Sequence, residues 1–144
     1  YVQTFLQADA SVVEFDAEHL RRVLVNLLDN ALRYISKQPD SLQISTGVAT
    51  NGQAGLQVWS DGPPLAKTVE RHLFEPFFSS ESRSSGLGLY ICRELCERHG
   101  ASIAYQRIPR HTARGLVEGN AFSLVFRPAQ TAHAADVPFD TPLV

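Results

Sequence analysis

The sequence contains no methionine, only two cysteines and one tryptophan among its 144 residues. No run of apolar residues approaches the ~18–20 needed for a membrane-spanning helix, and no signal-peptide pattern is present. Lys and Arg number 13 and Asp and Glu 15, which gives a formal net charge of −2. This balance favours neither a nucleic acid nor an anionic membrane surface as a partner. Because the first residue is Tyr1 and methionine is absent, we interpret the chain as a fragment that begins within a longer protein.

The two cysteines, Cys92 and Cys96, lie four residues apart in a segment with a helical pattern. They could form a redox pair or half of a metal site, or they could be two small side chains in a reduced protein. No second Cys or His pair has the spacing of a zinc site, which favours the structural interpretation.

Apolar residues recur at three- and four-residue intervals in two segments, which predicts helices over 17–35 and 88–99. Asp16 is a suitable N-cap for the first helix, and Gly100 is placed to end the second. A shorter helix is predicted over 68–74.

Between the helices, the sequence predicts strands separated by turns. They are expected at 12–15, at 42–46, around 56–58, at 103–107 and at 121–127, with Asn51-Gly52 as a hairpin turn. The expected fold class is α/β: a two-layer α/β sandwich whose mixed, mostly antiparallel sheet is covered on one face by helices. Residues 1–128 would form one domain, and 129–144 a mobile C-terminal tail.

The first group of candidate site residues lies in the middle of the long helix. Asn26 and Asn30 are one turn apart, so both side chains point to the same side. Two amide oxygens on one face can hold a Mg²⁺ ion that also binds phosphate, Arg33 can reach a phosphate, and Tyr34 can pack on a ribose or base. A solvated helix face is the alternative, but with Asp29 the group places three poor helix formers in mid-helix.

Two further groups involve glycine. Ser60-Asp61-Gly62 follows an expected strand, where a hydroxyl or carboxylate could accept a hydrogen bond from an adenine amino group; an ordinary tight turn is the alternative. The sequence 74–78, Phe-Glu-Pro-Phe-Phe, is followed by polar residues and then by 86–89, Gly-Leu-Gly-Leu. Glycines at a helix start let backbone amides approach phosphates, and the polar stretch 79–86 could close over a nucleotide.

In their order and spacing, these groups resemble the nucleotide-binding domain of sensor histidine kinases. Residues 20–34 look like the N box of that family, 60–65 like its first glycine box, 74–78 like its F box and 85–89 like its second glycine box. The superfamily includes the gyrase B subunit, heat-shock chaperone ATPases and mismatch-repair ATPases. The short polar stretch between the last two boxes is similar to that of the nitrogen-regulation and pilus-regulation type of kinase.

The resemblance implies a Bergerat-type ATP-binding fold, with ATP between the helices and the polar lid. By matching position, Asn26 and Asn30 would hold Mg²⁺, Arg33 would contact phosphate and Tyr34 would lie near the sugar. The glycine boxes would supply the remaining nucleotide contacts: Ser60, Asp61, Gly62, Ser85, Gly86, Leu87, Gly88 and Leu89.

The resemblance also implies the reaction. The ATPase relatives carry a glutamate at the position of Asn26, where it activates water, and an amide cannot take that proton. Asn26 and Arg33 are therefore expected to support transfer of the γ-phosphate to a protein histidine. None of the five histidines of this chain fits the acceptor motif. The expected partners are a histidine-bearing dimerisation domain of the parent kinase and a response regulator, with no nucleic acid and no direct membrane contact. The domain is expected in the cytoplasm, with the parent anchored in the bacterial inner membrane.

The first glycine box departs from the Asp-x-Gly-x-Gly pattern of the family. Ser60 stands at the adenine-reading aspartate and Pro64 at the second glycine, while Ser84-Ser85 stand where glycine is common. Strand alternation turns Ser60 inward with Leu56 and Val58, and it turns Asp61 away. Two other functions stay open: a degenerate module that binds a partner and holds nucleotide weakly, and a serine kinase that acts as an anti-sigma factor.

Overall fold

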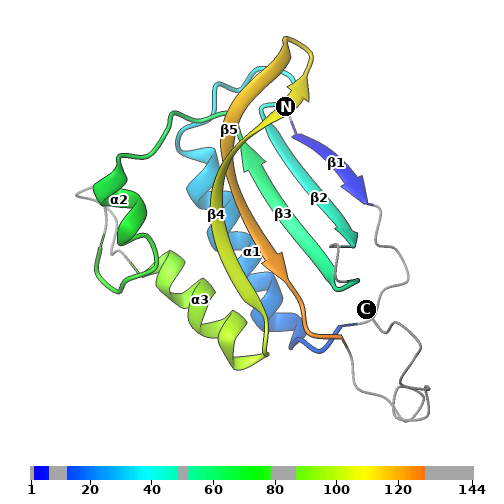
Figure 1. Cartoon of the computed structure of the whole chain (residues 1–144), viewed down its shortest axis with the longest axis vertical. Helices are drawn as coiled ribbons and strands as arrows, with labels where there is room; N and C mark the ends of the chain where they lie inside the picture. The colour runs from blue at the N-terminus through cyan, green and yellow to red at the C-terminus, as the bar shows by residue number, and fades with distance from the viewer. Residues whose placement is uncertain (1, 7–12, 49–51, 79–86, 129–144) are drawn as a thin grey trace.

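The computed structural model describes residues 2–6, 13–48, 52–78 and 87–128. Figure 1 shows these residues as one curved sheet with helices packed against it. In chain order the elements are β1 (Val2–Leu6), α1 (Ala17–Leu32), β2 (Leu42–Val48), β3 (Ala54–Ser60), α2 (Lys67–Arg71), α3 (Gly88–Arg98), β4 (Ser102–Thr112) and β5 (Gly115–Val125). The predicted tail 129–144 and the predicted polar lid 79–86 lie outside the described residues, as does Asn51 of the predicted hairpin turn.

The sheet has the strand order β1-β2-β3-β5-β4, in which only the β1–β2 pair is parallel. Helices α1 and α3 pack against each other and against one face of this sheet (Figure 1). The predicted fold class, a mixed sheet covered on one face by helices, is confirmed. The core is built from apolar side chains of both layers: Val23, Leu27, Ala31, Leu42, Val58, Cys92, Leu95, Cys96, Phe122 and Leu124 are among its buried members.

Helix α1 begins where its capping residue predicts. The Asp16 carboxylate accepts hydrogen bonds from the backbone N–H groups of Glu18 at 2.9 Å and His19 at 3.1 Å. The helix ends at Leu32, three residues before the predicted end. Ile35 is nevertheless buried, so the apolar period continues past the last helical residue and made the helix look longer in the sequence.

The prediction of a strand at 12–15 was wrong for the residues that can be compared. Residues 13–15 contain only an isolated β-bridge, Val13 with Pro128, beside which the Glu14 N–H donates to the Arg127 carbonyl at 3.3 Å. The strand that precedes α1 is β1, which sequence analysis missed. It lies at the sheet edge, where Val2 and Phe5 remain exposed, so burial imposes little alternation on it.

The hairpin of β4 and β5 is much longer than predicted, because each strand has 11 residues. Pro109 lies within β4, beyond the predicted end of this strand at residue 107. A proline is tolerated there because β4 is an edge strand, so its missing N–H disrupts no second ladder. Gly115, with a φ of 92°, supplies the left-handed residue at the turn.

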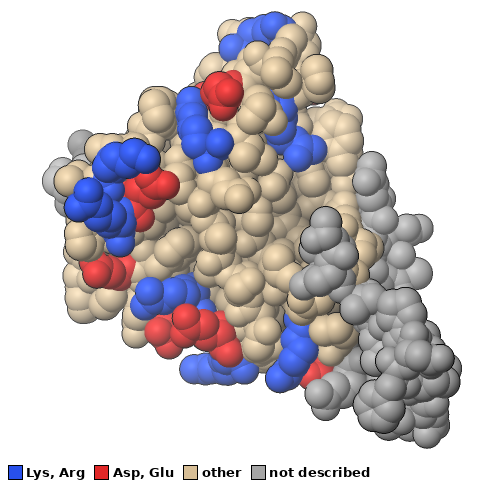
Figure 2. Space-filling view, in the orientation of Figure 1, with Lys and Arg blue, Asp and Glu red and all other residues tan. Residues whose placement is uncertain are grey.

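The other two helices lie close to their predicted ranges. Helix α3 ends at Arg98, and Gly100 follows with a φ of 70°, the left-handed conformation expected after a helix end. Helix α2 is shorter than the predicted 68–74. None of the helices in the described ranges has the length and apolarity to cross a membrane. Figure 2 shows basic and acidic side chains interspersed on the face that it views.

Candidate nucleotide-binding site

A cavity of about 710 Å³ is enclosed by α1, α2, α3, the strands β3 and β5, and the loop after β3. Eight of the predicted site residues line it: Asn26, Asn30, Arg33, Tyr34, Ser60, Leu87, Gly88 and Leu89. Asp61 and Gly62 are absent from its lining, and Ser85 and Gly86 lie outside the described residues. Lining residues that sequence analysis did not select include Asp29, Pro63, Leu65, Phe78, Asn120 and Phe122.

One face of α1 forms the polar wall of the cavity. Asn26 and Asn30 lie one turn apart on this face, while Val23 and Leu27 are fully buried in the core on another. The amphipathic helix therefore fixes both amides by its own packing, since rotation about the helix axis would expose the apolar side chains.

The start of α3 lies next to Asn26 at the edge of the cavity. A Cβ atom placed on Gly88 would lie 3.8 Å from the Oδ1 atom of Asn26. Leu87, the N-cap residue of α3, makes no side-chain cap hydrogen bond, and the first N–H groups of a helix have no acceptor within it. Such a helix start attracts anions, and here it lies next to an amide oxygen.

Cys92 of α3 is buried against α1, next to the wall that carries Asn26. Its thiol donates a hydrogen bond to the carbonyl oxygen of Val23 at 3.6 Å, which joins α3 to α1 next to Asn26. Burial raises the pKa of Cys92 to about 12 and that of Cys96 to about 11. Both thiols are free, buried and protonated at neutral pH, which agrees with the structural interpretation of the pair.

The opposite wall comes from adjacent strands of the sheet. Ser60 is 6% exposed, and Asn120 is its partner in the register of β3 and β5. The Asn120 Oδ1 atom accepts hydrogen bonds from the Tyr105 hydroxyl at 2.6 Å and the Arg107 guanidinium at 3.1 Å, and its Nδ2 atom donates to the Pro63 carbonyl at 2.8 Å. Sequence analysis missed Asn120 because only the strand register reveals that it lies beside Ser60.

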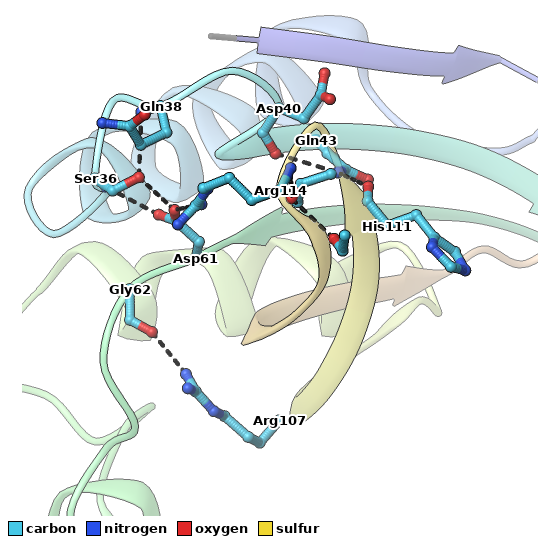
Figure 3. A network of polar contacts seen from close by, with 11 residues as sticks. Ser36, Gln38, Asp40, Gln43, Asp61, Gly62, Arg107, His111 and Arg114 are labelled. Carbon is cyan, nitrogen blue, oxygen red and sulfur yellow. Dashed lines mark hydrogen bonds and ion pairs between the residues drawn. The ribbon is translucent and has the colours of Figure 1, made fainter.

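Asp61 points away from the cavity. Its side chain is 2% exposed and accepts hydrogen bonds from the Ser36 N–H at 2.9 Å and hydroxyl at 2.5 Å, and from Arg114 at 2.6 Å (Figure 3). Burial raises the pKa of Asp61, but the hydrogen bonds from Ser36 and Arg114 outweigh burial and leave this pKa below its usual value. The orientations of Ser60 and Asp61 are those that strand alternation predicts.

Gly62 belongs to the support of the cavity rather than to its lining. A Cβ atom at this position would lie 3.2 Å from the Cβ atom of Tyr34 and 3.5 Å from the Nδ2 atom of Asn120. The glycine therefore lets the loop fit tightly between α1 and β5.

The sandwich fold and its cavity, with amides on one helix next to the start of another, are those of a nucleotide-binding α/β sandwich domain. The chain belongs to the family of histidine kinase-, DNA gyrase B- and HSP90-like ATPases, whose profile matches residues 15–130. The predicted resemblance is thereby confirmed.

Individual relatives narrow the assignment within this family. The chain is 38% identical to the sensor protein kinase PilS of Pseudomonas aeruginosa over 109 residues, which is 72% of this chain and 21% of PilS. It is 34% identical to the sensor protein KdpD of Escherichia coli over 85% of this chain and 13% of KdpD. The solved catalytic domain of histidine kinase ThkA aligns with a TM-score of 0.69 and 26% identity, over 88% of this chain and 79% of that domain.

These similarities confirm the prediction of an ATP-binding catalytic domain of a two-component sensor histidine kinase. The chain spans about a fifth or less of the length of these curated relatives. The similarity to PilS agrees with the predicted pilus-regulation type, but the match to KdpD shows that other types are similar as well.

Proposed function

We propose that this domain binds ATP with Mg²⁺ in the cavity and transfers the γ-phosphate to a histidine on a dimerisation domain outside this chain. The observation that carries the proposal is the pair of amides, Asn26 and Asn30, on the cavity wall next to the start of α3, whose N-cap Leu87 makes no side-chain cap hydrogen bond. Amide oxygens and open N–H groups are complementary to a cation and to the phosphates that accompany it.

The residues present fit a magnesium ion. Asn26 and Asn30 offer oxygen ligands, and Mg²⁺ takes few ligands from a protein because it keeps water and phosphate oxygens. Within the described part of the chain, no group of three or more His, Cys, Asp or Glu side chains could form a site made by protein ligands alone. When bound, the ion would neutralise charge on the phosphates.

The other lining residues fit the remaining parts of the nucleotide. Arg33, at the C-cap of α1, would hold a phosphate, and Tyr34 next to it would pack on the sugar; both residues line the cavity, which supports these roles. The backbone of Leu87, Gly88 and Leu89 would bind phosphate oxygens at the start of α3.

The base would lie against Ser60 and Asn120. Ser60 offers a neutral hydroxyl in place of the family's aspartate, so it can accept a hydrogen bond from an adenine amino group only weakly. The Asn120 amide, already held by Tyr105, Arg107 and Pro63, offers a fixed polar group beside it.

Transfer to histidine is preferred over hydrolysis because Asn26 cannot act as a base. Asp29, the acidic residue of the described cavity lining, is exposed to solvent, and we assign it no role in activating water. Substitution of Asp29 by asparagine should then leave any slow ATP hydrolysis unchanged.

We propose the same cellular arrangement as for a membrane-bound sensor kinase. The domain would act in the cytoplasm, attached to a parent anchored in the bacterial inner membrane, and the phosphorylated histidine would pass its phosphate to a response regulator. The support is the family and the short share of each longer sensor protein that the chain covers.

Calorimetry with ATP and with ADP, each with and without Mg²⁺, tests the proposal. Wild type should bind both nucleotides more tightly with Mg²⁺. Asn30→Ala should lose this Mg²⁺ dependence and still melt cooperatively, because Asn30 is half-buried on the cavity wall and its truncation leaves no cavity in the apolar core. Glu94→Ala, an exposed change on α3 outside the cavity lining, is the control and should bind as wild type does.

Two results would contradict the proposal. Unchanged affinity of Asn30→Ala with and without Mg²⁺ would remove the metal assignment. Alkali-stable, acid-labile label on the isolated chain after incubation with radiolabelled ATP would mean that the acceptor lies within this chain.

A second function is favoured by Ser60 and Pro64, which replace an aspartate and a glycine of the family's first glycine box. A domain with these changes could contact a partner without using nucleotide. Complete absence of ATP and ADP binding by the folded wild type would favour this alternative over the kinase function.

A further inference from the structure

We infer that Asp61 is a positioning residue: with Ser36 and Arg114 it fixes the loop after β3 and so sets nucleotide affinity without touching the nucleotide. This inference rests on the proposed function, because it concerns the same cavity. Figure 3 shows the Asp61 carboxylate between Ser36, from the segment after α1, and Arg114, from the tip of the β4–β5 hairpin.

The loop that Asp61 begins carries part of the cavity wall and is held at successive residues. The Asp61 N–H donates to the Ser41 carbonyl at 3.0 Å, and the Gly62 carbonyl accepts from Arg107 at 2.7 Å. The next carbonyl, that of Pro63, accepts from Asn120 at 2.8 Å. A shift of the loop would therefore change the cavity wall directly.

The Asp61 carboxylate joins this loop to two segments that are distant in the sequence. Ser36 lies two residues after Tyr34, so its two hydrogen bonds to Asp61 hold the end of α1, where Arg33 and Tyr34 line the cavity. Arg114 adds the third partner from the opposite side at 2.6 Å. A buried carboxylate with several charge-assisted hydrogen bonds has one well-defined position, which makes it suited to hold a loop.

The hairpin tip that carries Arg114 is itself anchored on the outer face of the sheet. The Trp59 indole N–H donates to the Ile108 carbonyl at 2.9 Å, and the Gln43 amide donates to the His111 carbonyl at 2.9 Å. Within the turn, the Thr112 hydroxyl bonds both the Arg114 N–H and the Gly115 carbonyl. Arg114 thus reaches Asp61 from a fixed base, although its side chain is 41% exposed.

The direction of the effect follows from this geometry. Loss of the ion pair with Arg114 releases the loop after β3, so the loop must become ordered when nucleotide binds. This ordering costs free energy, and the affinity therefore falls for ATP and ADP alike. The expected weakening is on the order of tenfold, the range seen when a residue that orients direct ligands is removed.

The test is a double-mutant cycle on the folded chain, with calorimetry of ATP-Mg²⁺ and ADP-Mg²⁺ and a thermal melt of each variant. Arg114→Gln and Asp61→Asn should each lower the affinity for ATP and the affinity for ADP by a similar factor. The double variant should bind both nucleotides no more weakly than Asp61→Asn does. Arg114→Lys should recover most of the affinity. Because Arg114 is half-exposed at the hairpin tip, its variants can be measured even if Asp61→Asn folds poorly.

A matched control separates positioning from general stability. Arg127 forms a 2.8 Å ion pair with Glu14, is 47% exposed and lies outside the cavity lining. Arg127→Gln should lower the melting temperature about as much as Arg114→Gln does, yet leave both dissociation constants unchanged.

Two results would overturn the positioning role of Asp61, and a third would contradict the proposed function. Wild-type affinity in Arg114→Gln and Asp61→Asn, with a lowered melting temperature, would overturn the positioning role and leave the proposed function standing. Strictly additive losses in the cycle would also overturn it. Absence of nucleotide binding by wild type would instead contradict the proposed function.

Discussion

Replacement of Ser60 by aspartate should tighten ATP binding and increase the preference for ATP over GTP. Ser60 lines the cavity, is 6% exposed and lies beside Asn120 in the strand register. A carboxylate at this largely buried position would accept a hydrogen bond from the adenine amino group. Guanine carries a carbonyl oxygen where adenine carries that amino group, so the same carboxylate would repel it.

The magnitude follows from the difference between a charged and a neutral acceptor. A hydrogen bond to a charged group contributes about 1–2 kcal/mol more than a neutral one, which corresponds to a gain of about 5- to 30-fold in ATP affinity. In the free protein the new carboxylate is desolvated without a full set of partners, so unfolding stability without nucleotide should fall by about 1–3 kcal/mol. The variant should thus be less stable alone and more strongly stabilised by ATP.

Calorimetry of wild type and Ser60→Asp with ATP and GTP, together with chemical denaturation without nucleotide, measures both effects. Asp61→Asn is the comparison, because a positioning residue should change both affinities by one factor and leave their ratio unaltered. An unchanged ATP-to-GTP ratio in Ser60→Asp would refute the assignment of Ser60 to the base. A changed ratio in Asp61→Asn would mean that Asp61 reads the base.

Two further predictions concern stability. A Cβ atom on Gly119 would lie 2.3 Å from a backbone oxygen of β3, so Gly119→Ala should lower the free energy of unfolding by about 2–3 kcal/mol in a urea titration. A Cβ atom on Gly47 would have no atom within 4 Å, so Gly47→Ala should stay within about 0.5 kcal/mol of wild type. Equal effects of the two substitutions would contradict the packing argument. The hydrogen bond from the backbone N–H of His19 lowers the pKa of Asp16 below its ordinary value of 3.8, so the cap stabilises the fold above that value and loses its effect as pH falls through the folded-state pKa. The melting-temperature difference between wild type and Asp16→Ala should therefore narrow from about pH 7 to about pH 3, and a difference that widens would contradict this sign.

Helix-capping preferences and helical periodicity were sufficient to predict the features that depend only on residues close together in the sequence. The carboxylate of Asp16 caps the helix that follows it, and the left-handed Gly100 ends α3, because capping involves only adjacent backbone groups. Asn26 and Asn30 face the same side because 3.6 residues make one helical turn, and the buried side chains between them show which side is the core.

The same rules failed where tertiary contacts set the outcome. The helical pattern extended to Ile35 although α1 stops at Leu32, because an apolar side chain can be buried from a turn as well as from a helix. The predicted strand stopped at residue 107, whereas β4 continues through Pro109, which its place at the sheet edge allows.

Local sequence patterns determined some residues of the site, and tertiary contacts determined the others. The sequence by itself selected the amide wall of α1 and the turn of Ser60 toward the cavity, since helical and strand periods decide which side a residue faces. Asn120 joined the site only through the register of β3 and β5, and Asp61 met Arg114 only because the long hairpin folds over the sheet. No local pattern encodes a contact between residues 53 positions apart, because it depends on how the strands pair and curve rather than on either residue alone.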